Sequence, residues 1–228
     1  MAISLTWLGH ATWMIDIGDQ KILLDPFITD NPAAPVKTDE VTADAILISH
    51  GHFDHVADAA AIANKNDATV VAIYEIASWF SQNHGVKNTI GMNIGGQTKL
   101  DSCTVKMTNA IHSSQLPDGS DGGNPAGFVV SAEGKNIYFA CDTALFSDMQ
   151  LIGKQGIDLA VVPIGDLFTM GIQDSIEAIK LINPKQVLPA HFNTWPPIEQ
   201  DSAAWAELVK SKTSAQPLVL QPGEQHEL

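Results

Sequence analysis

The sequence predicts an α/β protein in which two β-sheets face each other and helices lie outside them. The first third is rich in strand-like runs, and residues 88–142 form a second such region. After Asp142, helix-like and strand-like segments alternate to the end of the chain. Since each sheet must bury an apolar face, this order favours two packed sheets. The 228 residues are 45% hydrophobic and contain no Pro/Gly/Ser-rich linker, so we expect one domain over residues 1–228.

Short apolar runs and turn residues predict the elements of the first half. Strands are expected within 3–18 and over 21–26, 45–49 and 69–73. The runs "AILIS" and "TVVAI" are continuously apolar, as is typical of strands covered on both faces. Helices are expected over 56–66 and 74–85, the second closed by Gly85. A proline-rich loop, 31–44, separates the first strands from the third.

The second half is predicted in the same way. Strands are expected over 98–110, 127–134 and 135–142, with a loop of turn-forming residues at 117–125. The alternating region then predicts helices over 145–156, 172–183 and 201–212, and strands over 157–165, 186–191 and 217–223.

Charge and composition narrow the classes of partner and location. The net charge of −14 repels nucleic-acid phosphates, so no nucleic-acid partner is expected. No apolar run is long enough to span a bilayer, and the N-terminus does not read as a signal peptide. The two cysteines lie far apart in sequence and predict no disulfide framework. We therefore expect a cytoplasmic protein without membrane association; a homo-oligomer is possible, but the sequence does not determine the oligomeric state.

The stretch "SHGHFDHV" at residues 49–56 is the strongest candidate for a functional site. His50 and His52 lie just past an apolar strand and, being two apart, point to one side of extended backbone. Both imidazoles can therefore reach one ion. Asp54 and His55 follow in the turn into the next helix and can face a second position. The alternative interpretation is a solvated loop that happens to be rich in histidine.

Three further metal-competent residues each follow an apolar strand. They are His112, Asp142 and His191. Each would be unremarkable alone, and it is the complete set that favours a metal site over a surface loop. Imidazole and carboxylate ligands together suit zinc, and also iron or manganese.

The motifs as a group resemble the metallo-β-lactamase superfamily. "HGHFDH" matches the H-x-H-x-D-H signature, and the segments "WLGHAT", "LLDP", "GNPAGFVV", "PIGDLFTMG" and "LPAHFNTWP" narrow the match. They resemble a branch of small bacterial and archaeal metal-dependent hydrolases related to ascorbate-6-phosphate lactonase. The resemblance covers residues 3–223.

The resemblance implies a four-layer αββα sandwich with two divalent metal ions at one edge of the sheets. The implied ligands are His50, His52 and His112 for one ion and Asp54, His55 and His191 for the other, with Asp142 bridging the two. Zinc is the expected metal, with manganese or iron as alternatives. The family more often has glycine before the bridging aspartate, where this chain has Cys141.

Other residues have two possible roles each. His10 either hydrogen-bonds substrate or its oxyanion near the metals, as a catalytic residue, or is held in a turn by backbone. Asp25 resembles a family aspartate that orients a ligand histidine from behind. Phe168 and Trp195 either line the substrate pocket or pack in the core, and Asn193 is a candidate substrate contact.

These observations predict a dinuclear metal-dependent hydrolase acting on a small molecule. A metal-bound hydroxide would attack a carbonyl or phosphoryl centre, with Asp54 orienting it. A lactone or other cyclic ester is the first expectation for the substrate, a phosphodiester the second, and β-lactam cleavage a possible side activity. Two other classes stay open. A flavodiiron-type redox protein would have Glu in place of His52 and a flavodoxin domain, and a non-catalytic metal-binding protein would not require the full ligand set.

Overall fold

Two seven-stranded β-sheets face each other in the computed structural model, which describes residues 2–228. The first sheet has, in spatial order, β14 (Gln225–Glu227), β1 (Ile3–Trp7), β2 (Trp13–Ile17), β3 (Gln20–Leu24), β4 (Ala45–Leu47), β5 (Thr69–Ile73) and β6 (Thr89–Met92). The second has β13 (Gln216–Pro217), β12 (Gln186–Ala190), β11 (Leu159–Pro163), β10 (Lys135–Phe139), β9 (Ala126–Ala132), β8 (Thr104–Asn109) and β7 (Gln97–Lys99).

The two sheets share one plan, with an antiparallel half and a parallel half. Strands β3 to β6 pair in parallel, as do β10 to β13, while the other neighbours are antiparallel. Every residue of β4 and β11 is buried, because these strands are covered on both faces. The carboxyl ends of the parallel strands meet at one edge of the sandwich, which is the edge that carries the predicted metal ligands.

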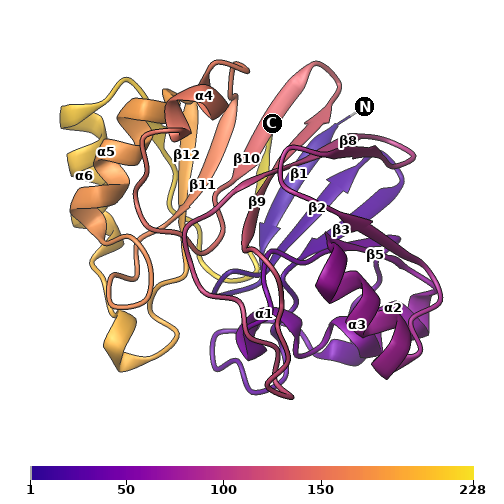
Figure 1. The fold of residues 1–228 in the computed structure, drawn as a ribbon. Coiled ribbons are helices and arrows are strands. Elements are labelled where there is room, and N and C mark those ends of the chain that lie inside the picture. Colours follow the sequence, from indigo (N-terminus) through magenta and orange to yellow (C-terminus); the bar gives the residue numbers. More distant parts are fainter. Residues whose placement is uncertain (1) are drawn as a thin grey trace.

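Helices cover both outer faces (Figure 1). The first sheet is flanked by α1 (Phe53–Val56), α2 (Ala59–Asn66) and α3 (Tyr74–His84), and the second by α4 (Met149–Gly153), α5 (Ile172–Ile182) and α6 (Ser202–Lys212). Two short 3₁₀ turns, Thr38–Glu40 and Pro196–Ile198, lie in the connections. The layer order of helix, sheet, sheet and helix confirms the expected αββα sandwich.

The last predicted strand is the clearest error in the element assignments. Residues 217–223 do not form a strand of the second sheet, since only Gln216 and Pro217 pair with β12. Pro222 has no N–H to donate, and Gly223 turns the chain with φ of 91°. The chain then crosses to the opposite sheet, where β14 pairs antiparallel with β1. The final strand therefore closes the first sheet and not the second.

The apolar interior lies between the sheets and under the helices. Its largest fully buried side chains include Trp13, Tyr138, Phe128 and Phe139 from the strands and Trp205 from α6. Within residues 2–228, none of the helices combines the length and apolar character that crossing a bilayer requires.

Candidate metal centre

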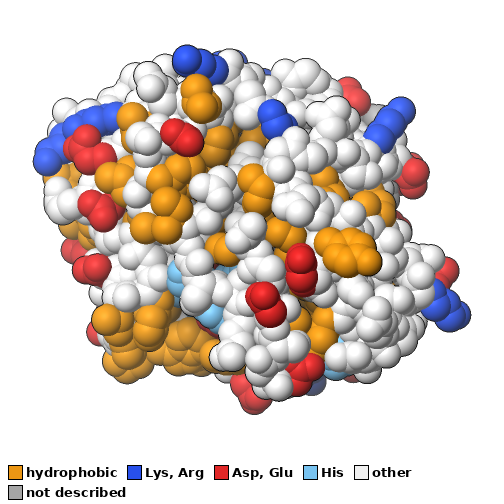
Figure 2. All heavy atoms as spheres, viewed as in Figure 1, with side chains coloured by type: hydrophobic (Ala, Val, Ile, Leu, Met, Phe, Trp, Pro, Cys, Tyr) orange, Lys and Arg blue, Asp and Glu red, His pale blue; other side chains and the backbone are white. Residues whose placement is uncertain are grey.

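The seven predicted ligands come together at the edge where the parallel strands end. His50 and His52 follow β4, His112 follows β8, Asp142 follows β10 and His191 follows β12. Asp54 and His55 belong to the single turn of α1, which begins directly after His52. Figure 2 shows pale-blue histidine side chains at the bottom of a hollow on this face, bordered by orange hydrophobic side chains.

Left-handed backbone occurs at one predicted ligand and at three residues next to the ligands. His10, Asp25, Cys141 and His191 all have left-handed backbone, with φ of 53°, 44°, 55° and 54°. Non-glycine residues rarely adopt this conformation, and such positions gather at functional sites. The same geometry accounts for the glycine that the family more often has before the bridging aspartate, because glycine enters this region without a Cβ clash.

Three imidazoles form the first donor group. The ring nitrogens that His50, His52 and His112 offer lie within 4.8 Å of one another. His50 Nε2 is 2.9 Å from His52 Nδ1, and the other nitrogen of His52 is 3.2 Å from Ser113 Oγ. His50 is fully buried, whereas His52 and His112 are partly open to the hollow.

The second donor group consists of His10, Asp54, His55 and His191, which meet the same distance criterion. All four residues are buried. This group contains the three residues expected for the second ion and adds His10, for which the sequence left open a substrate contact or a place in a turn.

Asp142 stands between the two groups. Its Oδ2 lies 3.0 Å from His191 Nε2 and 3.4 Å from His55 Nε2 on one side. On the other side it lies 3.7 Å from His112 Nε2 and 4.0 Å from His50 Nε2. One carboxylate oxygen thus faces four imidazole nitrogens, two from each group.

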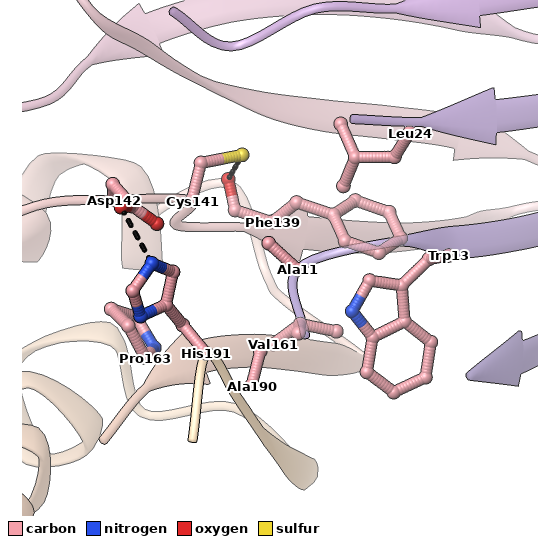
Figure 3. Close-up of a pocket in the computed structure, with 10 residues that line it drawn as sticks. All are labelled: Ala11, Trp13, Leu24, Phe139, Cys141, Asp142, Val161, Pro163, Ala190 and His191. Carbon is pink, nitrogen blue, oxygen red and sulfur yellow. Dashed lines mark hydrogen bonds and ion pairs between the residues drawn. The ribbon is translucent and has the colours of Figure 1, made fainter. Parts of the chain in front are cut away.

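Figure 3 shows Asp142 and His191 facing each other across the ends of β10 and β12. Cys141 turns its Sγ towards the backbone oxygen of Phe139, at 3.7 Å. The void that these residues border measures about 10 Å³, which is room for about one water molecule. Cys141 therefore fills space behind the donor groups and does not reach into the hollow.

Burial and neighbouring charges shift the pKa values of the ionisable groups at the centre strongly. Burial opposes ionisation of Asp142, but His191 and His55 hold its pKa well below the usual range. Burial would lower the pKa of His55, yet Asp142, Asp54 and Asp25 together raise it well above its ordinary value. For His50, burial reinforced by His55 keeps the pKa well below 6.5. The carboxylates of the site are therefore ionised, and a cation placed among them would be stabilised.

Asp25 orients one histidine from each donor group. Its Oδ2 accepts hydrogen bonds from His55 Nδ1 at 2.9 Å and from the Ser49 hydroxyl at 2.6 Å, and its Oδ1 accepts from Ser49 N at 2.8 Å. The same hydroxyl oxygen lies 2.9 Å from His50 Nδ1 and can accept a hydrogen bond from it. In the neutral rings with Nδ1 protonated, which metal binding requires, the Nε2 lone pairs of His50 and His55 point into the centre.

His10 lies behind the centre and not at its mouth. The ring is fully buried, with Nε2 3.0 Å from Asp54 Oδ2 and Nδ1 2.8 Å from Thr194 Oγ1. Burial, reinforced by the neighbouring His191, lowers the pKa of His10 to about 4, so the His10 ring is neutral at neutral pH. This arrangement suits a residue that positions Asp54, and both ring nitrogens are already engaged.

The donor set fits divalent metal ions. His55 Nε2 and Asp142 Oδ1 are buried without a hydrogen-bond partner, and unpaired buried polar atoms are costly. His55 Nε2 faces Asp142 Oδ2 at 3.4 Å and Asp54 Oδ2 at 3.7 Å. Neutral imidazoles and carboxylates that converge in this way are ligands for zinc, manganese or iron.

An open pocket of about 710 Å³ lies over the donor groups. Its walls include His52, Asp54, His112, Asp142 and His191 from the centre and Phe53, Ser113, Gln115, Leu116, Pro117, Phe168 and Trp195 around them. Two of the three predicted substrate contacts, Phe168 and Trp195, are thus placed at the pocket. Asn193 is exposed and lies outside this lining, and its Oδ1 accepts a hydrogen bond from Gln200 N at 2.7 Å.

Sequence reasoning missed several residues of the site. Ser49 was assigned only to the end of an apolar strand, although a hydroxyl beside a ligand histidine is a usable signal for a supporting hydrogen bond. Ser113, directly after His112, carries the same signal. Phe53 lies within the histidine motif itself, and its place between ligand residues is the signal in the sequence; the structure shows that its ring is exposed and lines the pocket.

Comparison with known proteins agrees with this geometry. The family model described as "Beta-lactamase superfamily domain" matches residues 4–191. A UPF0173 metal-dependent hydrolase of Pelotomaculum thermopropionicum is 48% identical over 231 residues, covering 99% of this chain and 100% of the relative.

Solved structures agree as well. Igni18, a metallo hydrolase from the hyperthermophilic archaeon Ignicoccus hospitalis, has a TM-score of 0.92 at 34% identity and covers 100% of this chain and 99% of its own. The metallo-β-lactamase fold protein YhfI of Bacillus subtilis, at 13% identity, shares the fold with a TM-score of 0.77 and coverage of 100% and 99%. The chain therefore belongs to the metallo-β-lactamase superfamily, among its UPF0173 metal-dependent hydrolases.

Proposed function

We propose that this metal-dependent hydrolase uses two divalent ions, foremost zinc, to cleave a carboxylic ester-type bond, and that a lactone is the leading substrate. The observation that supports two ions is the position of Asp142 Oδ2, within 4.0 Å of imidazole nitrogens from both donor groups. His50, His52 and His112 would hold one ion, and Asp54, His55 and His191 the other, with Asp142 shared. When bound, such ions polarise a substrate carbonyl and lower the pKa of coordinated water towards ~7.

The residues of the chain prepare this chemistry in three ways. Asp25 and Ser49 fix the imidazoles of His50 and His55 with Nε2 inward. His10 holds Asp54 Oδ2, and because Asp54 stays ionised and lines the pocket, its carboxylate can orient the attacking water. The pocket borders both donor groups, so a substrate bound in it would present its carbonyl carbon to them.

The overall reaction requires no protein nucleophile. Water adds to the carbonyl carbon, the bond from that carbon to the ester oxygen breaks, and the products are a carboxylate and an alcohol, with one proton released. In a lactone the two products remain joined as a hydroxy acid. Hydrolysis can therefore be followed by proton release at constant pH, whatever the substituents on the ring.

A substrate panel with and without metal tests this proposal. The purified protein is stripped with a chelator, reloaded with zinc, manganese or iron, and assayed on lactones, acyclic esters, thioesters, phosphodiesters and β-lactams. We expect metal-dependent turnover with kcat/KM for lactones and esters at least about tenfold above that for phosphodiesters. Highest turnover on phosphodiesters would replace the ester proposal, and turnover that survives stripping would overturn the metal chemistry. Bovine serum albumin treated with zinc serves as the control for unspecific ester cleavage.

A further inference from the structure

Exposed apolar side chains are concentrated at the mouth of the pocket. Six large hydrophobic side chains are exposed in the described part of the chain. Two of them, Phe53 at 57% and Phe168 at 54% exposure, line the pocket itself. Two more, Ile111 and Leu167, directly precede His112 and Phe168. Large apolar groups gathered in this way mark a site that receives an apolar ligand.

One wall of the pocket is a packed aromatic cluster. The ring centroids of Phe53, Phe27 and Trp195 lie 5.8 to 6.1 Å from one another. Phe27 is buried, and the ring centroid of Trp195 lies 5.0 Å from that of His10. The cluster therefore packs against the histidine that contacts Asp54. A wall fixed in this way can hold an apolar group beside the reacting carbonyl with little loss of side-chain entropy.

A second hollow adjoins the pocket. It measures about 630 Å³, and Phe53 and Pro117 line both spaces. Its other walls are largely apolar and come from α1, α2 and α3, among them Val56, Ala60 and Trp79. The exposed ring of Phe53 therefore stands between the pocket over the metal centre and an apolar hollow on the helical layer.

A hydrogen bond fixes the far wall of this hollow. Trp79 Nε1 donates to Asp118 Oδ2 at 2.6 Å, which ties the segment carrying Pro117 to α3. Apart from the histidines, among them His84 at the hollow, the ionisable groups that line the two spaces are carboxylates: Asp54 and Asp142 at the centre and Asp118 at the hollow. Among residues 2–228, none of the lysines lines either space, and the sequence has no arginine. These walls disfavour an anionic chain.

We propose that the substrate is an uncharged lactone or ester whose apolar chain leaves the pocket over Phe53 and lies in the hollow between α3 and Pro117. This inference rests on the proposed function and adds its substrate class. Phe53 and Trp195 contact the part of the chain next to the carbonyl, and Val56, Ala60 and Trp79 contact the part beyond. A substrate with a phosphate or carboxylate on that chain would meet Asp118 in a hollow whose described lining contains no lysine.

A chain-length series with the zinc-loaded protein tests the inference. Lactones with alkyl substituents from methyl to octyl are compared with counterparts that end in a carboxylate. We expect kcat/KM to rise about two- to fourfold per buried methylene group until the hollow is filled. The carboxylate-ended compounds should stay at least about tenfold below alkyl compounds of equal length.

Substitutions in the hollow supply the structural control. Ala57 and Ala60 line the hollow, so Ala57→Phe and Ala60→Phe should reduce the ratio of long-chain to short-chain kcat/KM at least about tenfold. Ala61 is exposed on the same helix as Ala60 but does not line the hollow, so Ala61→Phe should keep the wild-type ratio. Two Phe variants are used so that the test can still be read if one of them does not fold.

The outcomes separate the two proposals. Three results would overturn the inference and leave the proposed function standing. They are metal-dependent turnover that does not change with chain length, a preference for carboxylate-ended chains, and an equal ratio of long-chain to short-chain kcat/KM in Ala60→Phe and Ala61→Phe. Absence of metal-dependent turnover on every member, including the shortest, would instead overturn the proposed function.

Discussion

Asp142→Asn is expected to lower kcat/KM at least about 10²–10³-fold, the scale observed when one preorganised electrostatic group is removed. The substitution keeps the size of the side chain but removes the negative charge that faces four imidazole nitrogens within 4.0 Å. An amide oxygen is a weak ligand for a shared position between two cations. The variant should therefore also retain less metal after dialysis, which metal analysis measures directly.

The matched control is Asp148→Asn, six residues further along the chain. Asp148 is exposed, and Ser147 Oγ lies 3.3 Å from its Oδ1. The control should keep metal and turnover at wild-type levels, and circular dichroism should show that both variants are folded. An Asp142→Asn protein with full metal content and full activity would exclude Asp142 as the shared ligand.

Asp25→Asn should weaken both the fold and metal binding. Asp25 is fully buried, pairs with His55 Nδ1 at 2.9 Å and accepts two hydrogen bonds from Ser49. In Asp25→Asn, an amide NH₂ turned towards His55 Nδ1 and the Ser49 hydroxyl would place a hydrogen-bond donor against two other donors. Breaking a buried pair of this kind costs about 3–5 kcal/mol of unfolding free energy, and loss of a residue that orients ligands costs about 10–100-fold in metal affinity.

The destabilisation should depend on pH in a defined direction. In the metal-free protein the pKa of His55 is raised well above its ordinary value of 6.5, chiefly by Asp142, Asp54 and Asp25 against the opposing effect of burial. A raised pKa contributes stability that is fully present below the unfolded value of 6.5 and is lost as pH rises through the folded value. The wild-type protein should therefore exceed Asp25→Asn in unfolding free energy by more at pH 6 than at high pH.

Urea unfolding of the metal-free proteins at pH 6 and at high pH measures the difference in unfolding free energy between wild type and Asp25→Asn. Asp19→Asn is the control, because Asp19 is exposed in the turn between β2 and β3. A difference that is equal at both pH values would show that Asp25 stabilises the fold without pairing to a charged His55. Equal metal affinity in Asp25→Asn and wild type would remove its role in orienting the ligands.

Much of the fold could be predicted because its signals are local. Continuous apolar runs identify β4, β5 and β11 as strands covered on both faces, and the order of elements indicates two sheets. The prediction for the C-terminal segment was wrong because "PLVLQPG" looks like a strand, whereas Pro222 and Gly223 turn the chain and the strand after them, β14, pairs with β1. Which sheet a strand joins is a long-range property that a local pattern does not contain.

The candidate site could likewise be predicted only in part from the sequence. The candidate ligands could be identified because five of them follow strands, whose ends collect at one edge, and Asp54 and His55 lie in the same histidine-rich motif. The contacts between them could not, because His10 meets Asp54 across 44 positions and Thr194 across 184. The pocket walls depend on loop conformation, which brings Phe53, Pro117, Phe168 and Trp195 together from four separate segments.

Metal stoichiometry coupled to activity tests the central claim most directly. The stripped protein is titrated with zinc while bound metal per chain and hydrolysis of the best substrate are measured on the same samples. We predict two ions per chain, with hydrolysis appearing only as zinc is loaded, and fewer than two ions in His52→Ala. Full hydrolysis by the stripped protein, or activity unrelated to the zinc bound, would contradict a metal-dependent site built on these histidines and aspartates.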